Sequence, residues 1–230
     1  MQRANCHWEK DKLFSDQFED VYYSAEDGLA ETRHVFLSGN DIESRFAGLA
    51  EGETFTIAET GFGTGLNFLA TLKLWQSEPR AGTLEFWSIE KYPVARADIA
   101  AIGKNWPELA PLAASLADRY NPSENGIYEI PLAQNAKLFL LVGDISEMLP
   151  QLPAHIDAWY LDGFAPDKNP QMWSAELFRE MHKRADSQTT IATYTAAGVV
   201  KKALRNHGFK IKRLPGFGKK WHMLKAWLDE

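Results

Sequence analysis

The chain has 230 residues, 45% hydrophobic and 24% charged, a composition typical of a globular protein with room for one α/β domain. Its net charge of −6 excludes a uniformly basic surface, so a nucleic-acid ligand would need a local basic patch. The single cysteine, Cys6, excludes an internal disulfide, and no histidine or cysteine spacing is typical of a metal site. We therefore predict no metal, no membrane span and a cytoplasmic location.

Residues 1–50 lack the regular alternation of apolar segments found in the rest of the chain. The segment 14–23 is polar and aromatic, and Gly28 and the pair Gly39-Asn40 indicate turns. We predict an N-terminal extension over residues 1–50 that is irregular apart from a short hairpin. It is expected to pack on a main domain formed by residues 51–230.

From residue 51 onward, strand patterns alternate with helix patterns. The predicted order is strand 55–59, helix 65–75, strand 84–90, helices 93–105 and 109–117, strands 127–132 and 137–142, strand 157–161, helix 173–183, strand 189–194, helix 199–206 and two strand-like runs within 209–228. This alternation indicates an α/β fold with a mostly parallel sheet covered by helices. The strands 127–132 and 137–142 could form a hairpin or simply lie paired in the sheet. A C-terminal hairpin is the one antiparallel departure that we expect from the parallel sheet.

A glycine-rich loop follows the first predicted strand of the main domain. Residues 59–67 read Glu-Thr-Gly-Phe-Gly-Thr-Gly-Leu-Asn, which places an acid two residues before a G-x-G-x-G run. This spacing differs from the G-x-G-x-x-G fingerprint of dinucleotide-binding proteins, in which a pyrophosphate lies on the helix N-terminus. The loop therefore favours a nucleoside with an amino-acid arm, such as S-adenosylmethionine, over a nicotinamide or flavin dinucleotide.

Acidic residues follow four of the predicted strands, and ligands of an open parallel sheet bind outside the carboxyl ends of its strands. Glu90 is expected to bind ribose hydroxyls, and Asp144 to accept from an adenine amino group. Glu59 is expected either to contact the methionine ammonium group or to order the loop. Asp162 is expected nearest the methyl group, where it would orient or deprotonate an amine. The alternatives are helix-capping or solvated acids, and a plain turn at Asp162.

Basic residues are concentrated near the end of the chain, with aromatic residues among them. This pattern predicts a patch that binds RNA phosphates and stacks bases, although a solvated basic surface gives the same pattern. The four basic residues that we select as substrate-binding candidates are Lys212, Arg213, Lys219 and Lys220.

Five segments together resemble one known family, the methyltransferase domain of the tRNA 5-methylaminomethyl-2-thiouridine biosynthesis bifunctional proteins (MnmC). They are residues 14–23, 31–37, 59–68, 161–173 and 216–220. The block from 161 to 173, Leu-Asp-Gly-Phe-Ala-Pro-Asp-Lys-Asn-Pro-Gln-Met-Trp, is specific to this family, whereas the glycine loop is common to many methyltransferases.

The resemblance implies a Rossmann-like domain that binds S-adenosylmethionine and methylates the amine of 5-aminomethyl-(2-thio)uridine at the wobble position of tRNA. It implies that Asp162 is the catalytic carboxylate. For such a reaction, we expect an aromatic residue near the site, Phe164 or Tyr22, to stack on the flipped uracil. The cofactor-binding residues that the resemblance implies are Gly61, Gly63, Gly65, Asn67, Glu90 and Asp144. Bifunctional members of the family also contain a flavin-dependent oxidoreductase domain, so such a domain or partner is expected to act in the preceding step.

Other functions remain open at the level of sequence. The net negative charge favours a methyltransferase for a small molecule or a protein. A catalytically silent module that binds tRNA or cofactor is a second alternative, although Asp162 beside an intact glycine loop argues against it. A nicotinamide oxidoreductase is disfavoured by the glycine spacing.

Overall fold

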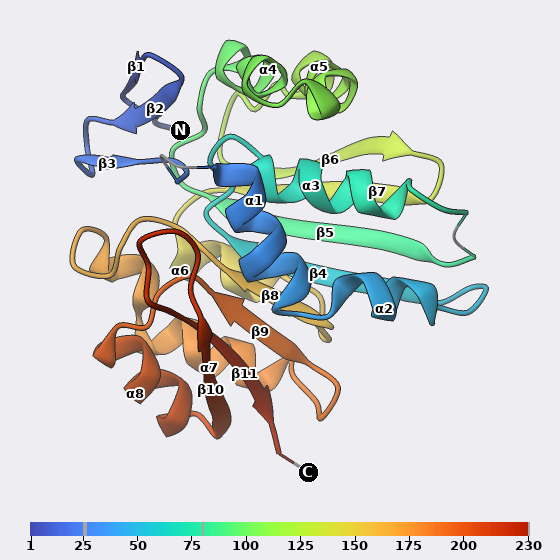
Figure 1. Cartoon of the computed structure of the whole chain (residues 1–230), viewed down its shortest axis with the longest axis vertical. Helices are drawn as coiled ribbons and strands as arrows, with labels where there is room; N and C mark the ends of the chain where they lie inside the picture. The colour runs from blue at the N-terminus through green and yellow to red at the C-terminus, as the bar shows by residue number, and fades with distance from the viewer. Residues whose placement is uncertain (25–26, 80, 230) are drawn as a thin grey trace.

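The computed structural model of the chain describes residues 1–24, 27–79 and 81–229. Within these residues, an eight-stranded sheet with the order β10-β11-β9-β8-β4-β5-β7-β6 forms the centre of the molecule (Figure 1). The strands are β4 (Thr54–Thr60), β5 (Thr83–Glu90), β6 (Gly126–Ala133), β7 (Ala136–Val142), β8 (Ala158–Leu161), β9 (Thr190–Thr193), β10 (Phe209–Pro215) and β11 (His222–Leu228). The predicted α/β fold with a mostly parallel sheet is confirmed.

The antiparallel part of the sheet is larger than we predicted. The five central strands β7, β5, β4, β8 and β9 are parallel, and β10 and β11 form the expected antiparallel hairpin. However, β6 is also antiparallel to β7, so the hairpin considered for these two strands is confirmed and the prediction of a single antiparallel departure is wrong. Two residues separate β6 from β7, and a link this short can only reverse the chain, because a parallel crossover needs a dozen or more residues.

Helices cover both faces of the sheet and create two apolar cores. Because successive strand residues point to opposite faces, Trp159 contributes to one core and its neighbour Tyr160 to the other. The helices on the Tyr160 side are α1 (Gly28–Thr32), the π-helix η1 (Arg33–Ser38), α2 (Ile42–Ala47), α3 (Leu66–Trp75), α4 (Arg96–Asn105), the 3₁₀ turn η2 (Pro107–Leu109) and α5 (Ala110–Arg119). Those on the Trp159 side are α6 (Ile145–Met148), the 3₁₀ turns η3 (Leu149–Gln151) and η4 (Pro170–Trp173), α7 (Ala175–Lys183) and α8 (Gly198–Asn206).

Residues 1–50 are more regular than we predicted. The strands β1 (Cys6–Glu9), β2 (Lys12–Ser15) and β3 (Asp20–Val21) form a separate three-stranded antiparallel sheet. Residues 28–47 are helical rather than irregular, and they pack on the large sheet through Leu29, Phe36 and Phe46, each at most 3% exposed. The turn predicted at Gly39-Asn40 is confirmed, because these residues form the turn between η1 and α2, whereas the turn predicted at Gly28 is wrong, because Gly28 begins α1.

The topology brings the ligand-binding loops to one edge of the sheet. Strand β4 lies between β5 and β8, so the chain builds one half of the sheet and then returns to build the other. In such sheets, ligands bind at the carboxyl ends of the strands beside this switch point. Strand β11 is antiparallel to β9, so the loop between β10 and β11 lies at the same edge. None of the helices that the structure describes is long and apolar enough to cross a membrane.

Candidate active site

A cavity of about 770 Å³ opens at this edge of the sheet, within the roughly 300–1,000 Å³ range typical of ligand-binding pockets. Its walls come from the glycine loop, the ends of β5, β7 and β8, the N-terminal segment and the β10–β11 loop. Among its lining residues are Gly63, Glu90, Asp144, Asp162, Phe164 and Lys220. The cavity thus contains most of the residues that the sequence predicts for the site.

The glycine loop connects β4 to α3 and touches the Asp162 loop. Gly61, Gly63 and Gly65 have φ angles of 81°, 54° and 77°, which side chains with a Cβ rarely adopt. A Cβ on Gly61 would lie 3.1 Å from the Cα of Gly163, so this glycine allows the two loops to approach closely. Gly61 and Gly63 line the cavity, so their backbone is accessible to a nucleoside. Gly65, which we also predicted to bind the cofactor, is not among the described residues that line the cavity, and Phe62 and Leu116 pack next to it.

Glu90 lies at the end of β5 and joins that strand to the glycine loop. Its Oε2 accepts a hydrogen bond from the Gly63 amide, and its Oε1 accepts one from the Tyr92 amide, both at 2.8 Å. Burial raises the pKa of Glu90, whereas these backbone hydrogen bonds lower it. Glu90 also lines the cavity, where a carboxylate can accept hydrogen bonds from a ribose diol.

Asp144 lies at the end of β7 and is the N-cap of α6. Its Oδ1 accepts from the Ser146 amide at 3.0 Å, and its Oδ2 accepts from Lys91 Nζ at 2.8 Å. The hydrogen bond from Lys91 lowers the pKa of Asp144 to about 2, so the carboxylate is ionised at neutral pH. The capping role that the sequence left open is therefore present, and the same side chain also lines the cavity.

Asp162 follows β8 and is held in a fixed orientation. Its Oδ1 accepts from the Gly163 amide at 2.8 Å, and its Oδ2 accepts from Asn67 Nδ2 at 2.7 Å. Thr60 Oγ1 donates to the Asp162 carbonyl at 2.7 Å and accepts from the Asp162 amide at 3.1 Å. Burial raises the pKa of Asp162 to about 6, which suits a group that exchanges a proton near neutral pH.

Behind Asp162 lies a buried chain of hydrogen bonds that includes Asn67 and Glu59. Asn67 Nδ2 donates both to Asp162 and, at 2.9 Å, to Glu59 Oε1, while its Oδ1 accepts from Thr32 Oγ1 at 2.7 Å. Ser88 Oγ donates to Glu59 Oε2 at 2.6 Å. Burial raises the pKa of Glu59 well above its usual value.

These hydrogen bonds indicate structural roles for Glu59 and Asn67, both of which were predicted to bind the cofactor. Glu59 is 1% exposed and is not among the described residues that line the cavity, so its placement fits ordering the loop and not contact with an ammonium group. Asn67 does line the cavity, but both of its amide hydrogens are already donated within the protein. Its geometry fits the orientation of Asp162 better than direct binding of a cofactor.

Aromatic residues from the N-terminal segment meet the Asp162 loop at the cavity. The Phe164 ring stacks on Phe18, with centroids 4.5 Å apart, and meets the edge of Tyr22 at 5.2 Å. Trp173 Nε1 donates to the Phe164 carbonyl at 3.0 Å, which fixes the loop backbone. Tyr22 and Phe164, both predicted to contact the substrate, therefore lie together in the cavity wall.

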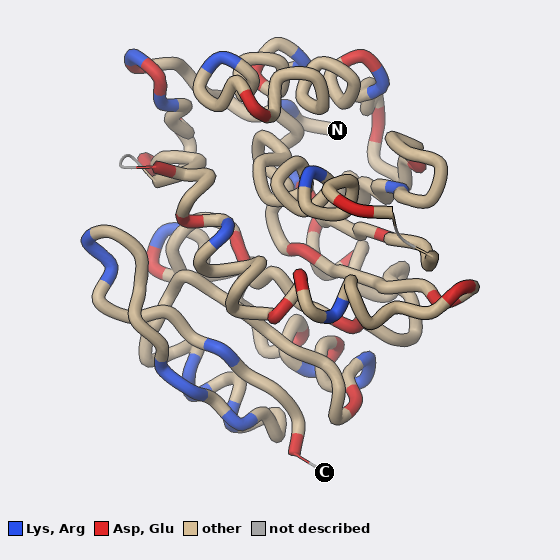
Figure 2. Tube along the Cα trace, turned by 45° about the vertical axis from the view of Figure 1, so that its right-hand side comes forward, with Lys and Arg blue, Asp and Glu red and all other residues tan. Residues whose placement is uncertain are grey.

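The four basic candidates do not form one continuous patch. Lys220 lines the cavity, where its Nζ lies 2.7 Å from Glu31 Oε1 and 4.0 Å from the centre of the Tyr194 ring. Lys212 and Arg213 are consecutive on β10 and so point to opposite faces of this edge strand. Lys219 is exposed in the β10–β11 loop. Figure 2 shows the basic residues distributed along the C-terminal hairpin and at the tip of its loop.

Glu31 and Tyr194 are site residues that the sequence patterns did not single out. Glu31 contacts Lys220, and Tyr194 Oη donates to the Gly163 carbonyl at 2.8 Å. Tyr194 directly follows β9, so the strand-end rule that selected Asp162 would also have found it. Glu31 lies in the family-like segment 31–37, but only the fold brings it to the cavity.

The strand order, the glycine loop after β4 and the acid at the end of β5 define the class of Rossmann-like α/β proteins that bind a nucleoside at a sheet edge. Residues 107–229 match the family described as S-adenosyl-L-methionine-dependent methyltransferase, and the chain belongs to this family. The cofactor that we predicted from the glycine loop is thus confirmed at the level of the family.

Similar proteins fit this assignment. The chain is 51% identical over 211 residues to the tRNA 5-methylaminomethyl-2-thiouridine biosynthesis bifunctional protein MnmC of Pseudomonas fluorescens, covering 91% of this chain and 32% of the relative. It is 44% identical over 227 residues to MnmC of Chromobacterium violaceum, covering 98% and 34%. The chain thus spans about a third of the length of these curated relatives.

The fold is also found in a crystal structure. That of MnmC2 from Aquifex aeolicus matches with a TM-score of 0.77 and 22% identity, covering all of this chain and 72% of the other. At this identity the match supports the fold alone. The predicted Rossmann-like methyltransferase fold is therefore confirmed, whereas the individual roles of the site residues stay predictions.

Proposed function

We propose that this chain transfers a methyl group from S-adenosylmethionine to the primary amine of 5-aminomethyl-(2-thio)uridine at the wobble position of tRNA. The names of the relatives support this substrate. The observation that carries the proposal is Asp162, which lines the same cavity as Glu90 and is oriented by Gly163 and Asn67. The product would be the methylaminomethyl nucleoside.

The residues of the cavity fit S-adenosylmethionine. Glu90 is available to the ribose hydroxyls, and Asp144 to the adenine amino group. Gly61 and Gly63 line the cavity and have no side chain that would keep a ligand away from the backbone. When bound, the cofactor supplies an electrophilic methyl group on a sulfonium centre.

Asp162 would act on the amine that receives the methyl group. An alkylamine is mostly protonated at neutral pH, like the lysine side chain, and a protonated amine has no lone pair for the attack. With a pKa of about 6, Asp162 is largely ionised at neutral pH, accepts a hydrogen bond from the amine and takes up the proton that it loses. Because its orientation is fixed by two hydrogen bonds, much of the acceleration would come from positioning.

The aromatic wall would hold the base that carries the amine. A wobble uridine lies in a loop and can be turned out of its stack into a pocket, where aromatic side chains hold its ring. Phe164 and Tyr22 line the cavity on the loop that carries Asp162 and on the facing N-terminal segment. Stacking on either ring would place the aminomethyl group near Asp162.

The relatives are named bifunctional proteins and are about three times longer than this chain. A flavin-dependent oxidoreductase domain or partner would therefore act in the preceding step, which provides the free amine. A tRNA substrate would also place the reaction in the cytoplasm.

Nucleoside analysis tests the proposed function. The purified protein is incubated with S-adenosylmethionine and tRNA that carries 5-aminomethyl-2-thiouridine, and the digested nucleosides are separated by mass. We expect the aminomethyl nucleoside to gain one methyl group, and the Asp162→Asn variant to leave it unchanged. Parallel incubations with free alkylamines and with bulk protein test the rival substrate classes. Methylation of these without methylation of tRNA would contradict the proposal.

A further inference from the structure

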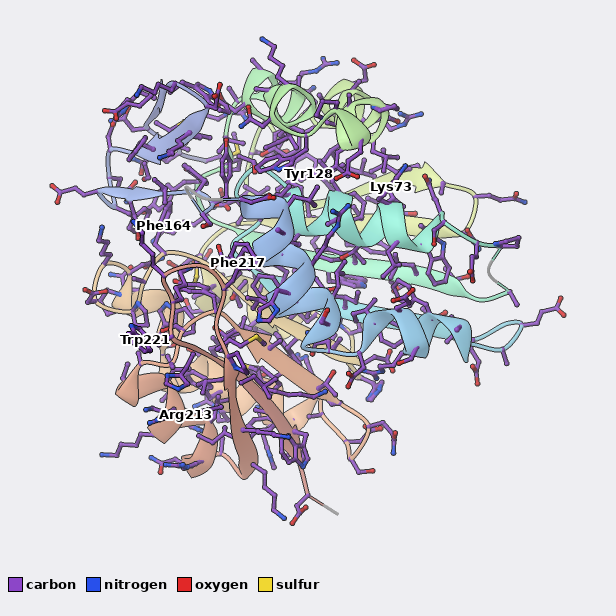
Figure 3. All side chains as sticks on the ribbon, in the orientation of Figure 1. Lys73, Tyr128, Phe164, Arg213, Phe217 and Trp221 are labelled. Atoms are coloured by element: carbon purple, nitrogen blue, oxygen red, sulfur yellow. The ribbon has the colours of Figure 1, made fainter. Side chains whose placement is uncertain are left out.

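The loop between β10 and β11, residues 216–221, forms part of the rim of the cavity. Its residue Lys220 lines the cavity, and the next residue, Trp221, points outward with 88% of its surface exposed. The loop therefore contacts the site on one side and solvent on the other. Figure 3 shows Phe217 and Trp221 on the same side of the molecule as Phe164.

Several contacts hold this loop in one conformation. The Gly216 amide donates to the Trp221 carbonyl at 3.1 Å, and the Lys220 amide donates to the Phe217 carbonyl at 3.0 Å. His34 bonds to the Pro215 carbonyl at 2.8 Å, just before the loop. Together with the pair between Lys220 and Glu31, these contacts fix the backbone of Trp221 beside the cavity.

The indole of Trp221 is exceptional among the tryptophans of the chain. Trp75, Trp159 and Trp173 are at most 6% exposed and belong to the apolar cores. Trp221 is the most exposed of the large hydrophobic residues in the described part of the chain. Within the same residues, its ring makes no described hydrogen bond, ring stack or cation–π contact. An exposed indole on a fixed backbone has an aromatic face available to a ligand.

The charges around Trp221 favour an anionic ligand. Residues 198–230 contain nine lysines and arginines and two acidic residues, although the whole chain has a net charge of −6. Arg213, near the end of β10, and Lys219, in the loop, are both exposed. Neither side chain forms an ion pair with any residue that the structure describes (1–24, 27–79 and 81–229). Unpaired cations beside an exposed aromatic face are typical of sites that bind single-stranded nucleic acid.

We infer that Trp221 stacks on the base of a nucleotide next to the methylated uridine, while Arg213 and Lys219 contact the adjacent phosphates. This inference rests on the proposed function, because it requires an RNA substrate with one nucleotide inside the cavity. The neighbouring nucleotide then crosses the rim, where Trp221 holds it. Because every base has an aromatic face, such a contact adds affinity without demanding a particular sequence.

Steady-state kinetics with the aminomethyl tRNA test this inference. The Trp221→Ala variant should raise the KM for tRNA roughly tenfold, the effect of losing one base–aromatic stack. Its kcat at saturating tRNA and its Kd for S-adenosylmethionine should stay unchanged, since Trp221 lies outside the residues that line the cavity. The Trp221→Phe variant should recover most of the affinity because it keeps an aromatic face.

Ile127→Ala is the matched control, because Ile127 is also exposed, at 47%, but lies on β6 at the opposite edge of the sheet. Its KM should equal that of the unaltered protein, and all variants should unfold at the same temperature. If the unaltered protein methylates the tRNA and Trp221→Ala has the same KM, the inference is overturned and the proposed function stands. A KM for Trp221→Phe as high as that for Trp221→Ala also overturns stacking. If the unaltered protein does not methylate the tRNA, the proposed function fails and this inference fails with it.

Discussion

The cavity and the C-terminal hairpin use charge in opposite ways. In the cavity, the carboxylates of Glu90 and Asp162 each accept two hydrogen bonds that fix their orientation. On the hairpin and its loop, Arg213 and Lys219 are exposed, and no described contact fixes their side chains. The first arrangement suits chemistry, where a displacement of an ångström matters, and the second suits attraction of a polyanion.

Lys220 belongs to both regions. It lies in the basic β10–β11 loop, but its ammonium group is paired with Glu31 inside the cavity. A substitution of Lys220 would therefore change the cavity and the loop together. For this reason, the experiments that separate the two regions use Arg213 and Lys219 for the hairpin and Asp162 and Glu90 for the cavity.

The largest effect is expected from Asp162→Asn. The variant keeps the size of the side chain but cannot take up a proton, so kcat should fall by about 10²- to 10⁴-fold. Its Kd for S-adenosylmethionine, measured by calorimetry, should change little, because Glu90 and Asp144 are unaltered. Full activity in this variant would remove Asp162 from the proposed chemistry.

Glu90→Ala should affect the cavity in the complementary way. It removes a carboxylate proposed to bind the ribose, and it leaves the amides of Gly63 and Tyr92 without an acceptor. We expect the Kd for S-adenosylmethionine to rise by about 10- to 100-fold, as for the loss of hydrogen bonds to a charged group. The control is Glu129→Ala on β6, where Glu129 pairs with Lys137 away from the cavity. An unchanged Kd for Glu90→Ala would reject its role.

Much of the fold and of the cavity could be predicted from the sequence, because short local patterns indicate the strands and the residues that follow them. Short apolar runs indicate the central strands, and the acids that follow them predict that Glu90, Asp144 and Asp162 share one edge of the sheet, as they do. The glycine loop is an equally local signal. The strands, the acids that follow them and the glycine loop can be found from short segments of sequence, once the strands are taken to run parallel.

The parts that the sequence did not reveal depend on contacts between distant segments. Glu31 meets Lys220 across 189 residues, and Asn67 meets Asp162 across 95, so neither contact leaves a local pattern. The side chain of Asn67 could equally have faced a cofactor. The helices of residues 28–47 were missed because Gly28 begins a helix and the true turn at Gly39-Asn40 divides the segment into short helices.

Charge reversal on the hairpin tests whether its exposed basic residues attract tRNA. The double variant Arg213→Glu with Lys219→Glu should weaken tRNA binding by roughly tenfold or more at physiological salt. It should also lower the slope of log Kd against log salt by about one for each phosphate that the protein no longer neutralises. Filter binding across a salt series measures both quantities.

The control is a second double variant that has the same change in net charge but is located away from the hairpin. Lys73 on α3 and Lys104 on α4 are exposed, and Figure 3 shows Lys73 well away from the hairpin. The Lys73→Glu and Lys104→Glu pair should leave the salt slope close to that of the unaltered protein. Equal losses in both double variants would mean that the total charge, and not the hairpin, attracts the tRNA.

The smallest expected effect is a shift in the pH dependence caused by Glu31→Gln. Asp162 acts only when ionised, so kcat/KM should fall as the pH drops through about 6, the pKa of Asp162. The negative charge of Glu31 raises this pKa, and the positive charge of Lys220 lowers it. Removal of the Glu31 charge also leaves Lys220 unpaired, so both changes favour the ionised form of Asp162. The acidic limb of the profile should therefore move to lower pH, whereas Lys220→Met should move it to higher pH. Shifts in the same direction for the two variants would show that the pair acts through the shape of the cavity rather than through its charges.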